Sequence, residues 1–270
     1  MKRLSLLFLI IFSSVAVFAE IPVSSAEAPL PAESSLPDRT SMIGISLGYT
    51  LSGFREETIF DTNRYINAFV FSIHSVLEKE NFIHSFNAGF YSGRTELLVE
   101  HPVYNFEQVY YYQIKDIYTR VFLEYSLVRK LWGNDTFPGY LGGAVRGDLY
   151  LLETLDNPLY INLSLIASLN LYASQKWVIN NKNSLVLTLS FPFFGYAARP
   201  HYAGFAWPLE TGVTGLNNYW ACFGSLKYYY KISSLFSLYS DIGFELSHID
   251  FPSPRKDASL QIKIGAVYMY

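Results

Sequence analysis

The chain has 270 residues, of which half are apolar and 17% are aromatic, and its formal net charge is −3. No stretch after the N-terminal segment approaches 18 unbroken apolar residues, which disfavours a helical membrane protein, and the acidic balance without a basic stripe argues against nucleic acid. A single cysteine, Cys222, excludes an internal disulfide.

The first 19 residues have the pattern of a secretory signal peptide. Lys2 and Arg3 precede an apolar run from Leu4 to Phe18, and the small residue Ala19 precedes the expected cleavage. The run is short for a membrane span, and polar sequence follows it. We therefore predict an exported protein. Without Lys2 and Arg3 it carries two positive charges fewer, so the formal charge moves from −3 to −5.

Residues 20–40 are rich in Pro, Ser, Ala and Glu and have no periodicity. Such a segment buries too little apolar surface to offset its ordering entropy. It predicts a disordered periplasmic lead, and the folded domain is expected to be 41–270.

From Ser41 onward the chain alternates apolar and polar residues with the period of a β-strand. Ten segments show the pattern: 42–54, 64–77, 82–93, 109–127, 140–152, 161–172, 184–191, 218–230, 235–248 and 260–270. In the first, one face carries Ile43, Ile45, Leu47, Tyr49 and Leu51, and the other carries Gly44, Ser46, Gly48, Thr50 and Ser52. An apolar face opposite a small polar face is typical of a barrel wall with lipid outside and a polar lumen inside.

The last segment, LQIKIGAVYMY, keeps the alternation and finishes on Tyr268 and Tyr270. Together with the signal peptide and the alternating strands, this resembles bacterial outer-membrane β-barrel proteins as a class, although no specific family motif is present. The resemblance implies an antiparallel up-and-down transmembrane β-barrel of about ten strands, with eight or twelve as alternatives. It also implies a Gram-negative-type envelope, an environment of outer-membrane lipid, and an assembly signal at Tyr268 and Tyr270 that the barrel-assembly machinery reads.

The shortest connections, near residues 78–81 and 231–234, set the expected orientation. Periplasmic turns of bacterial barrels are short and extracellular loops are longer. Both termini are therefore expected in the periplasm, and the long segment 192–217 is expected to be an extracellular loop.

Charged residues within the strands share the phase that faces the lumen. Four basic and four acidic residues are predicted to form a balanced lumen charge network: Arg120, Glu124, Arg146, Asp148, Lys227, Asp241, Glu245 and Lys263. Facing lipid, each basic residue would cost roughly 2 to 4 kcal/mol at mid-depth. A network of both signs in a ten-stranded barrel favours a narrow or plugged lumen over a wide ion-selective pore.

Segment 192–217 combines aromatic residues with three prolines, and loops of this length are commonly functional. Candidate lid or ligand residues are Tyr196, Arg199, His201, Tyr202, Phe205 and Trp207. A small solute or a sugar is the expected ligand class.

Three functions stay open. We favour a narrow porin-like or substrate-specific uptake protein with loop 192–217 as its lid. A sealed structural or adhesive barrel is the alternative. A rim hydrolase is the third, with His248 and Asp250 near the rim or Ser72 and His74 on one strand face as candidate groups. No catalytic residue, cofactor or metal site is predicted.

Overall fold

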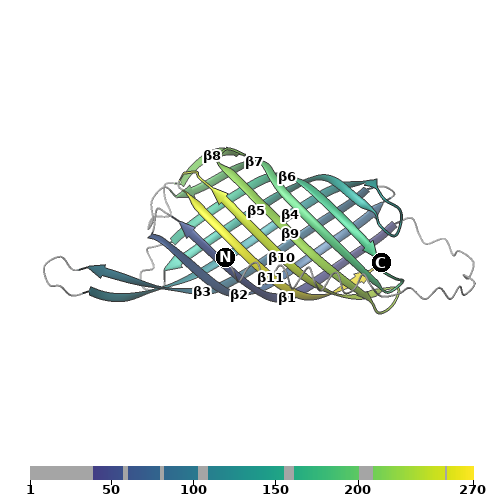
Figure 1. The fold of residues 1–270 in the computed structure, drawn as a ribbon, viewed down its shortest axis with the longest axis horizontal. Helices are drawn as coiled ribbons and strands as arrows, with labels where there is room; N and C mark the ends of the chain where they lie inside the picture. The colour runs from purple at the N-terminus through teal and green to yellow at the C-terminus, as the bar shows by residue number, and fades with distance from the viewer. Residues whose placement is uncertain are drawn as a thin grey trace, which may run out of the picture. The chain divides into compact units, whose positions relative to one another are not determined.

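The computed structural model describes residues 39–56, 60–79, 82–102, 109–154, 161–200, 209–252 and 254–270, all within one compact unit, Asp38–Tyr270 (Figure 1). Side chains are placed for most of these residues. The predicted signal peptide and residues 20–38 of the predicted periplasmic lead lie outside the described residues, so both stay predictions; the last two residues of the lead, Arg39 and Thr40, belong to a strand.

Eleven strands account for most of this unit. They are β1 (Arg39–Glu56), β2 (Phe60–Lys79), β3 (Phe82–Pro102), β4 (Val109–Trp132), β5 (Gly139–Thr154), β6 (Ile161–Val178), β7 (Asn183–Pro200), β8 (Leu209–Gly215), β9 (Tyr219–Lys231), β10 (Phe236–Ile249) and β11 (Arg255–Met269). The described part of the chain contains no helix long and apolar enough to cross a membrane.

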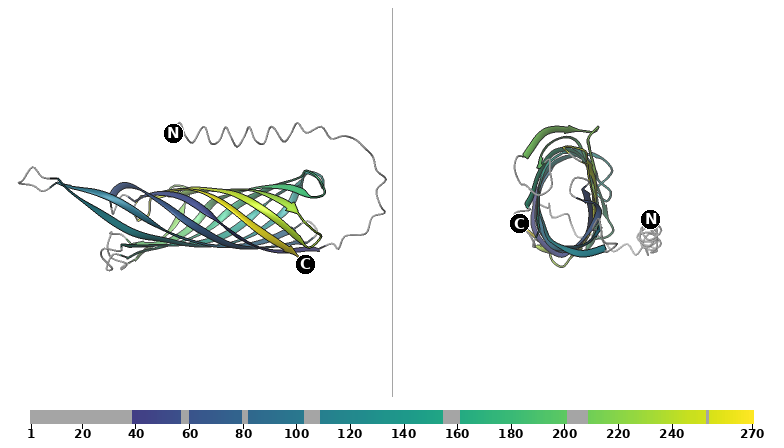
Figure 2. Two further views of the ribbon diagram at one scale, coloured as in Figure 1. Left: turned by 90° about the horizontal axis from the view of Figure 1, so that it is seen from below. Right: turned by 90° about the vertical axis from the view of Figure 1, so that its left-hand side faces the viewer.

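Ten of these strands close into an antiparallel ring. Neighbouring strands pair in chain order from β1 to β7. In the ring β7 then pairs with β9, β9 with β10, and β10 with β11. The ring closes because β1 pairs with β11 from Met42↔Met269 to Glu56↔Arg255. The end-on view in Figure 2 shows this closed ring. The predicted ten-stranded barrel is thus confirmed, with β8 as an additional strand.

The alternation seen in the sequence fixes which side of the wall each residue occupies. On β1, Ser46 and Thr50 are buried toward the lumen, while Leu47 between them is 65% exposed on the outside. Phe69 and Ile264 are likewise 81% and 70% exposed. Large apolar side chains on the outer face form a belt suited to lipid, and the pairing of β1 with β11 closes the ring of strands behind it.

The two connections predicted to be shortest lie at one end of the barrel, where β1 begins and β11 ends. Here the Tyr270 amide donates to the Ser41 carbonyl and the Met269 amide donates to the Leu235 carbonyl, both at 2.9 Å. The turn at 232–235 and the connection from Lys79 to Phe82 lie at this end, which we call the termini end. The opposite end, where β3 leads to β4, is the hairpin end.

The structure corrects the prediction of a long loop over 192–217. β7 continues to Pro200, and β8 forms a hairpin with it from Phe194↔Gly215 to Pro200↔Leu209. Pro192 suggested the end of a strand because it lacks an amide donor. Pro192 lies between two pairings on one side of β7: the pairing with β9 ends at Ser190, and the pairing with β8 begins at Phe194. On this side of β7, therefore, no strand-to-strand hydrogen bond requires an amide donor at residue 192.

The loop predicted between β3 and β4 is also largely strand. The two strands pair continuously to Pro102↔Val109, whereas the pairing of β4 with β5 begins at Asp116↔Thr154 and that of β3 with β2 ends at Asn67↔Arg94. The hairpin therefore extends beyond its neighbours, as Figure 1 shows on its left-hand side.

The apolar core lies inside the barrel, toward the hairpin end. Its buried members come from β1 to β7, β9 and β10: Phe54, Ile66, Ala68, Val70, Tyr91, Tyr118, Tyr150, Leu152, Ile166, Ala197, Tyr219, Ala221, Phe223 and Ile249. Phe251 packs against them from the connection between β10 and β11. Side chains thus fill this half of the lumen.

Candidate functional site: the occluded lumen

All eight residues of the predicted lumen charge network face the interior. Lys227 is half-buried. The side chains of the other seven are at most 11% exposed. That the eight act together as one charge network stays a prediction.

Arg120 on β4 is the centre of this network. Its guanidinium donates five hydrogen bonds: two to Asp148 Oδ1, at 3.0 and 2.6 Å, two to the carboxylate of Glu245, at 2.6 and 2.8 Å, and one to the Tyr91 hydroxyl, at 3.3 Å. Five is the full donor capacity of an arginine, so this buried charge is completely satisfied.

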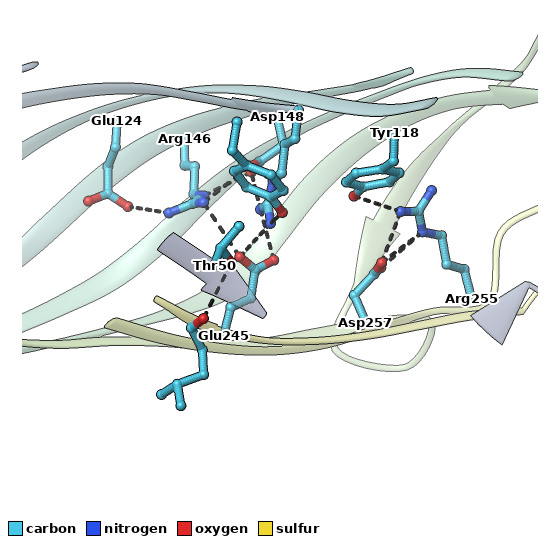
Figure 3. A network of polar contacts seen from close by, with 11 residues as sticks. Thr50, Tyr118, Glu124, Arg146, Asp148, Glu245, Arg255 and Asp257 are labelled. Atoms are coloured by element: carbon cyan, nitrogen blue, oxygen red, sulfur yellow. Dashed lines mark hydrogen bonds and ion pairs between the residues drawn. The ribbon is translucent and has the colours of Figure 1, made fainter. Parts of the chain in front are cut away.

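The partner Glu245 lies across the lumen. It is on β10, five positions from β4 in the ten-membered ring, which is the opposite wall. Two carboxylates and one guanidinium thereby form a bridge across the barrel. Figure 3 labels its two acids, Asp148 and Glu245, near the centre of the view. Since these groups are buried, removal of one partner would leave an uncompensated charge in a dry interior.

Arg146 on β5 forms the next layer toward the termini end. It donates to Asp148 Oδ2 at 2.8 Å and to Glu124 Oε2 at 3.4 Å. Its guanidinium lies 4.0 Å from the ring centroid of Phe223 and 5.0 Å from that of Phe122. Aromatic faces stabilise a cation at such distances, so Arg146 is held on two sides.

The structure adds a second cluster that the sequence did not indicate. Arg255 on β11 donates to Asp257 and, at 3.1 Å, to the Tyr118 hydroxyl on the far wall, as the right part of Figure 3 shows. Arg64 on β2 pairs with Asp116 on β4 nearby. Arg255 falls outside the predicted strand segments, and Arg64 is the first residue of the predicted segment 64–77.

Aromatic rings link the two clusters. The guanidinium of Arg120 lies 4.6 Å from the Tyr150 ring centroid, and that of Arg255 lies 4.5 Å from the same ring. Tyr118 stacks on Phe54 with centroids 5.3 Å apart. These rings and cations alternate across the lumen and occupy the half toward the hairpin end.

Between Arg146 and the termini end, the lumen opens into a cavity of about 450 Å³. We call this cavity the cup. Its wall includes Lys227, Lys263 and Asp241, and Phe122, Phe223, Arg146 and Glu245 bound it on the side of the Arg120 bridge. Lys263 Nζ contacts Asp241 Oδ2 at 3.0 Å, and the Ser225 hydroxyl donates to Asp241 Oδ1 at 2.7 Å.

The predicted lid residues separate in the structure. Tyr196 is 44% exposed on the outer face of β7, while Arg199 is fully buried and donates from Nη1 to the Phe251 carbonyl at 2.9 Å. His201, Tyr202, Phe205 and Trp207 lie outside the described residues. Arg199 and Phe251 thus connect β7 to the β10–β11 connection at the hairpin end.

The hydrolase candidates find little support in the described residues. His248 Nε2 and Asp250 Oδ1 are 2.8 Å apart beside Trp220. Ser72 is hydrogen-bonded to Ser46 at 2.6 Å, and His74 Nδ1 to the Tyr239 hydroxyl at 3.2 Å, so these two groups have separate partners. Among the residues that the structure describes, no group of three His, Cys, Asp or Glu side chains is placed to hold a metal ion.

Comparisons with known proteins agree on the architecture. No protein-family model and no curated protein sequence matches this chain. The structure of the outer membrane protease OmpT from Escherichia coli is similar with a TM-score of 0.55 and 7% identity, covering 87% of this chain and 98% of that one. The translocator domain of NalP from Neisseria meningitidis gives 0.40 and 8%, covering 85% and 88%. Ail of Yersinia pestis gives 0.29 and 15%, covering 85% and 99%.

The likeness to the OmpT structure, at 7% identity, shows the fold, which is that of bacterial outer-membrane β-barrel proteins. The predicted class is therefore confirmed: the chain is an all-β, closed antiparallel ten-stranded barrel of the outer-membrane type with one extra strand.

Proposed function

We propose that this protein is a sealed, non-conducting outer-membrane barrel that holds the β3–β4 hairpin above the cell surface as a structural or adhesive element. In this proposal the termini end faces the periplasm and the hairpin end faces outward. The arrangement of short connections at the termini end supports this orientation, because bacterial barrels have short periplasmic turns.

The bridge from Arg120 to Asp148 and Glu245 carries the proposal. It spans opposite walls, satisfies every donor of the guanidinium, and is backed by the apolar core toward the hairpin end. A solute path through this layer would require two buried carboxylates and a buried arginine to separate, and an unpaired buried charge costs several kcal/mol per ion. The porin-like uptake function with segment 192–217 as a gate stays a prediction that this layer disfavours.

Single-channel recording in a planar bilayer tests the sealed lumen. The refolded wild-type protein is expected to be silent. A triple variant, Arg120→Ala with Asp148→Ala and Glu245→Ala, removes the bridge without leaving one of its charges unpaired, and it is expected to give steady openings. Circular dichroism and heat-dependent gel migration of both proteins verify folding. Steady conductance of the folded wild-type protein would overturn the proposal.

The orientation has its own test. An epitope tag inserted between the strands of the β3–β4 hairpin is expected to bind antibody on intact cells. A tag in the turn 232–235 is expected to bind only after the outer membrane is permeabilised. The reverse pattern would place the hairpin in the periplasm and remove its proposed role.

A further inference from the structure

We propose that the cup is a binding site for a small anion bearing phosphate or carboxylate groups, with Lys227 as its principal contact. This inference concerns the cavity at the termini end and does not depend on the barrel being sealed.

The first argument is the charge that the cup leaves unneutralised. Three of its lining acids have partners: Asp241 contacts Lys263, Glu124 contacts Arg146, and Glu245 contacts Arg120. Four lining lysines form no ion pair with any residue that the structure describes: Lys176, Lys182, Lys227 and Lys231. Glu78 is a lining acid that likewise forms no ion pair with the described residues. Arg120 and Arg146 also share Asp148, so the network of these two arginines has one carboxylate in excess. Counted with Glu78, two negative charges stand against four lysines, and the remaining positive charge attracts a negatively charged ligand.

The second argument is the position of Lys227. Asp241 is on β10. In the strand register it lies opposite Lys227 on one neighbouring strand, β9, and opposite Lys263 on the other, β11. One carboxylate therefore stands in a row between two lysines, and its ion pair is with Lys263. The charge of Lys227 is left for a second anion, at a half-buried position where water screens it less than at the surface.

The third argument is the shape and lining of the cavity. A volume of about 450 Å³ falls within the range of small-molecule sites. The hydroxyl-bearing side chains Tyr172, Tyr229 and Thr188 line the same cavity and add hydrogen-bonding groups. Phe223 is part of the same lining, and its ring already holds Arg146 at 4.0 Å. The cup thus suits an anion of sugar-phosphate size with polar and apolar parts.

The lysines nearest the turns complete the picture. Lys182 lies in the turn between β6 and β7, and Lys176 and Lys231 lie near the ends of β6 and β9 at the termini end. A cavity with cations at its entrance and a cation in its wall draws anions inward, and this attraction weakens as ionic strength rises.

Isothermal titration of the refolded full chain in a non-ionic detergent tests the site, with pyrophosphate and citrate as probes and glucose as an uncharged comparison. At low ionic strength we expect one anion to bind per barrel, glucose to give no heat, and affinity to fall as NaCl is added. Pyrophosphate bound in preference to citrate would identify a phosphate ligand, and the opposite preference a carboxylate ligand.

Lys227→Met removes the charge while it keeps the length of the side chain. It is expected to weaken anion binding at least tenfold, and Lys227→Arg is expected to retain binding. Lys256→Met is the matched control, because Lys256 is an exposed lysine near the hairpin end of β11, outside the cup. Failure of the wild-type protein to bind either anion, or equal binding by wild type and Lys227→Met, would overturn the proposal.

Discussion

The two halves of the lumen use charge in different ways. Toward the hairpin end, Arg120, Arg255 and Arg64 are buried, paired with carboxylates and in contact with aromatic rings. Toward the termini end, the wall of the cup carries the ion pair between Lys263 and Asp241, and the cup itself has a volume of about 450 Å³. The comparison teaches that similar inward-facing charges can act as packing in one half and as an open lining in the other, depending on how much volume surrounds them.

The largest expected effect comes from breaking the bridge in the packed half. Arg120→Ala leaves Asp148 and Glu245 buried without their shared partner, and the free energy of unfolding is expected to fall by about 3 to 5 kcal/mol. Urea unfolding in lipid vesicles measures this change. Lys227→Ala in the cup is the matched control and is expected to change the free energy by about 0.5 kcal/mol or less, because it breaks no ion pair with a described residue. Equal losses in the two variants would contradict the distinction.

A smaller effect is expected from added volume. A Cβ at Gly93 would lie 2.5 Å from the Asn67 carbonyl oxygen and 2.7 Å from Ala68 Cβ, whereas a Cβ at Gly243 in the cup would meet nothing closer than 3.7 Å. Gly93→Ala is therefore expected to cost about 1 to 3 kcal/mol through overpacking, and Gly243→Ala close to nothing. The same unfolding measurement compares them. A larger loss for Gly243→Ala would mean that the cup is packed as tightly as the other half.

The smallest effect is expected from a single hydroxyl in the cup. Ser225→Ala removes the hydrogen bond to Asp241 but leaves its ion pair with Lys263. The expected cost is about 1.5 kcal/mol, the lower value for a hydrogen bond to a charged group. A loss as large as that of Arg120→Ala would show that Asp241 lies in an environment as dry as the bridge.

Sequence reasoning was most successful where a rule acts locally. The period of two indicated the lumen-facing phase of Arg120, Asp148, Asp241 and Lys263. The structure then shows which of them pair, as Arg120–Asp148 and Lys263–Asp241. It was least successful at strand ends. The stretches 94–102 and 192–200 fall outside the predicted strand segments, yet they continue as strands because a neighbouring strand satisfies their backbone groups.

The class of fold and the face on which a strand residue lies could therefore be predicted from the sequence alone, because side-chain direction in a strand depends only on position along the chain. The tertiary structure alone decided that Glu245 reaches Arg120 from the opposite wall, that Arg255 joins Tyr118, and that the lumen divides into a packed half and a cup. These contacts depend on ring closure and on the distance across the barrel, which residues distant in sequence set together and which no local pattern records.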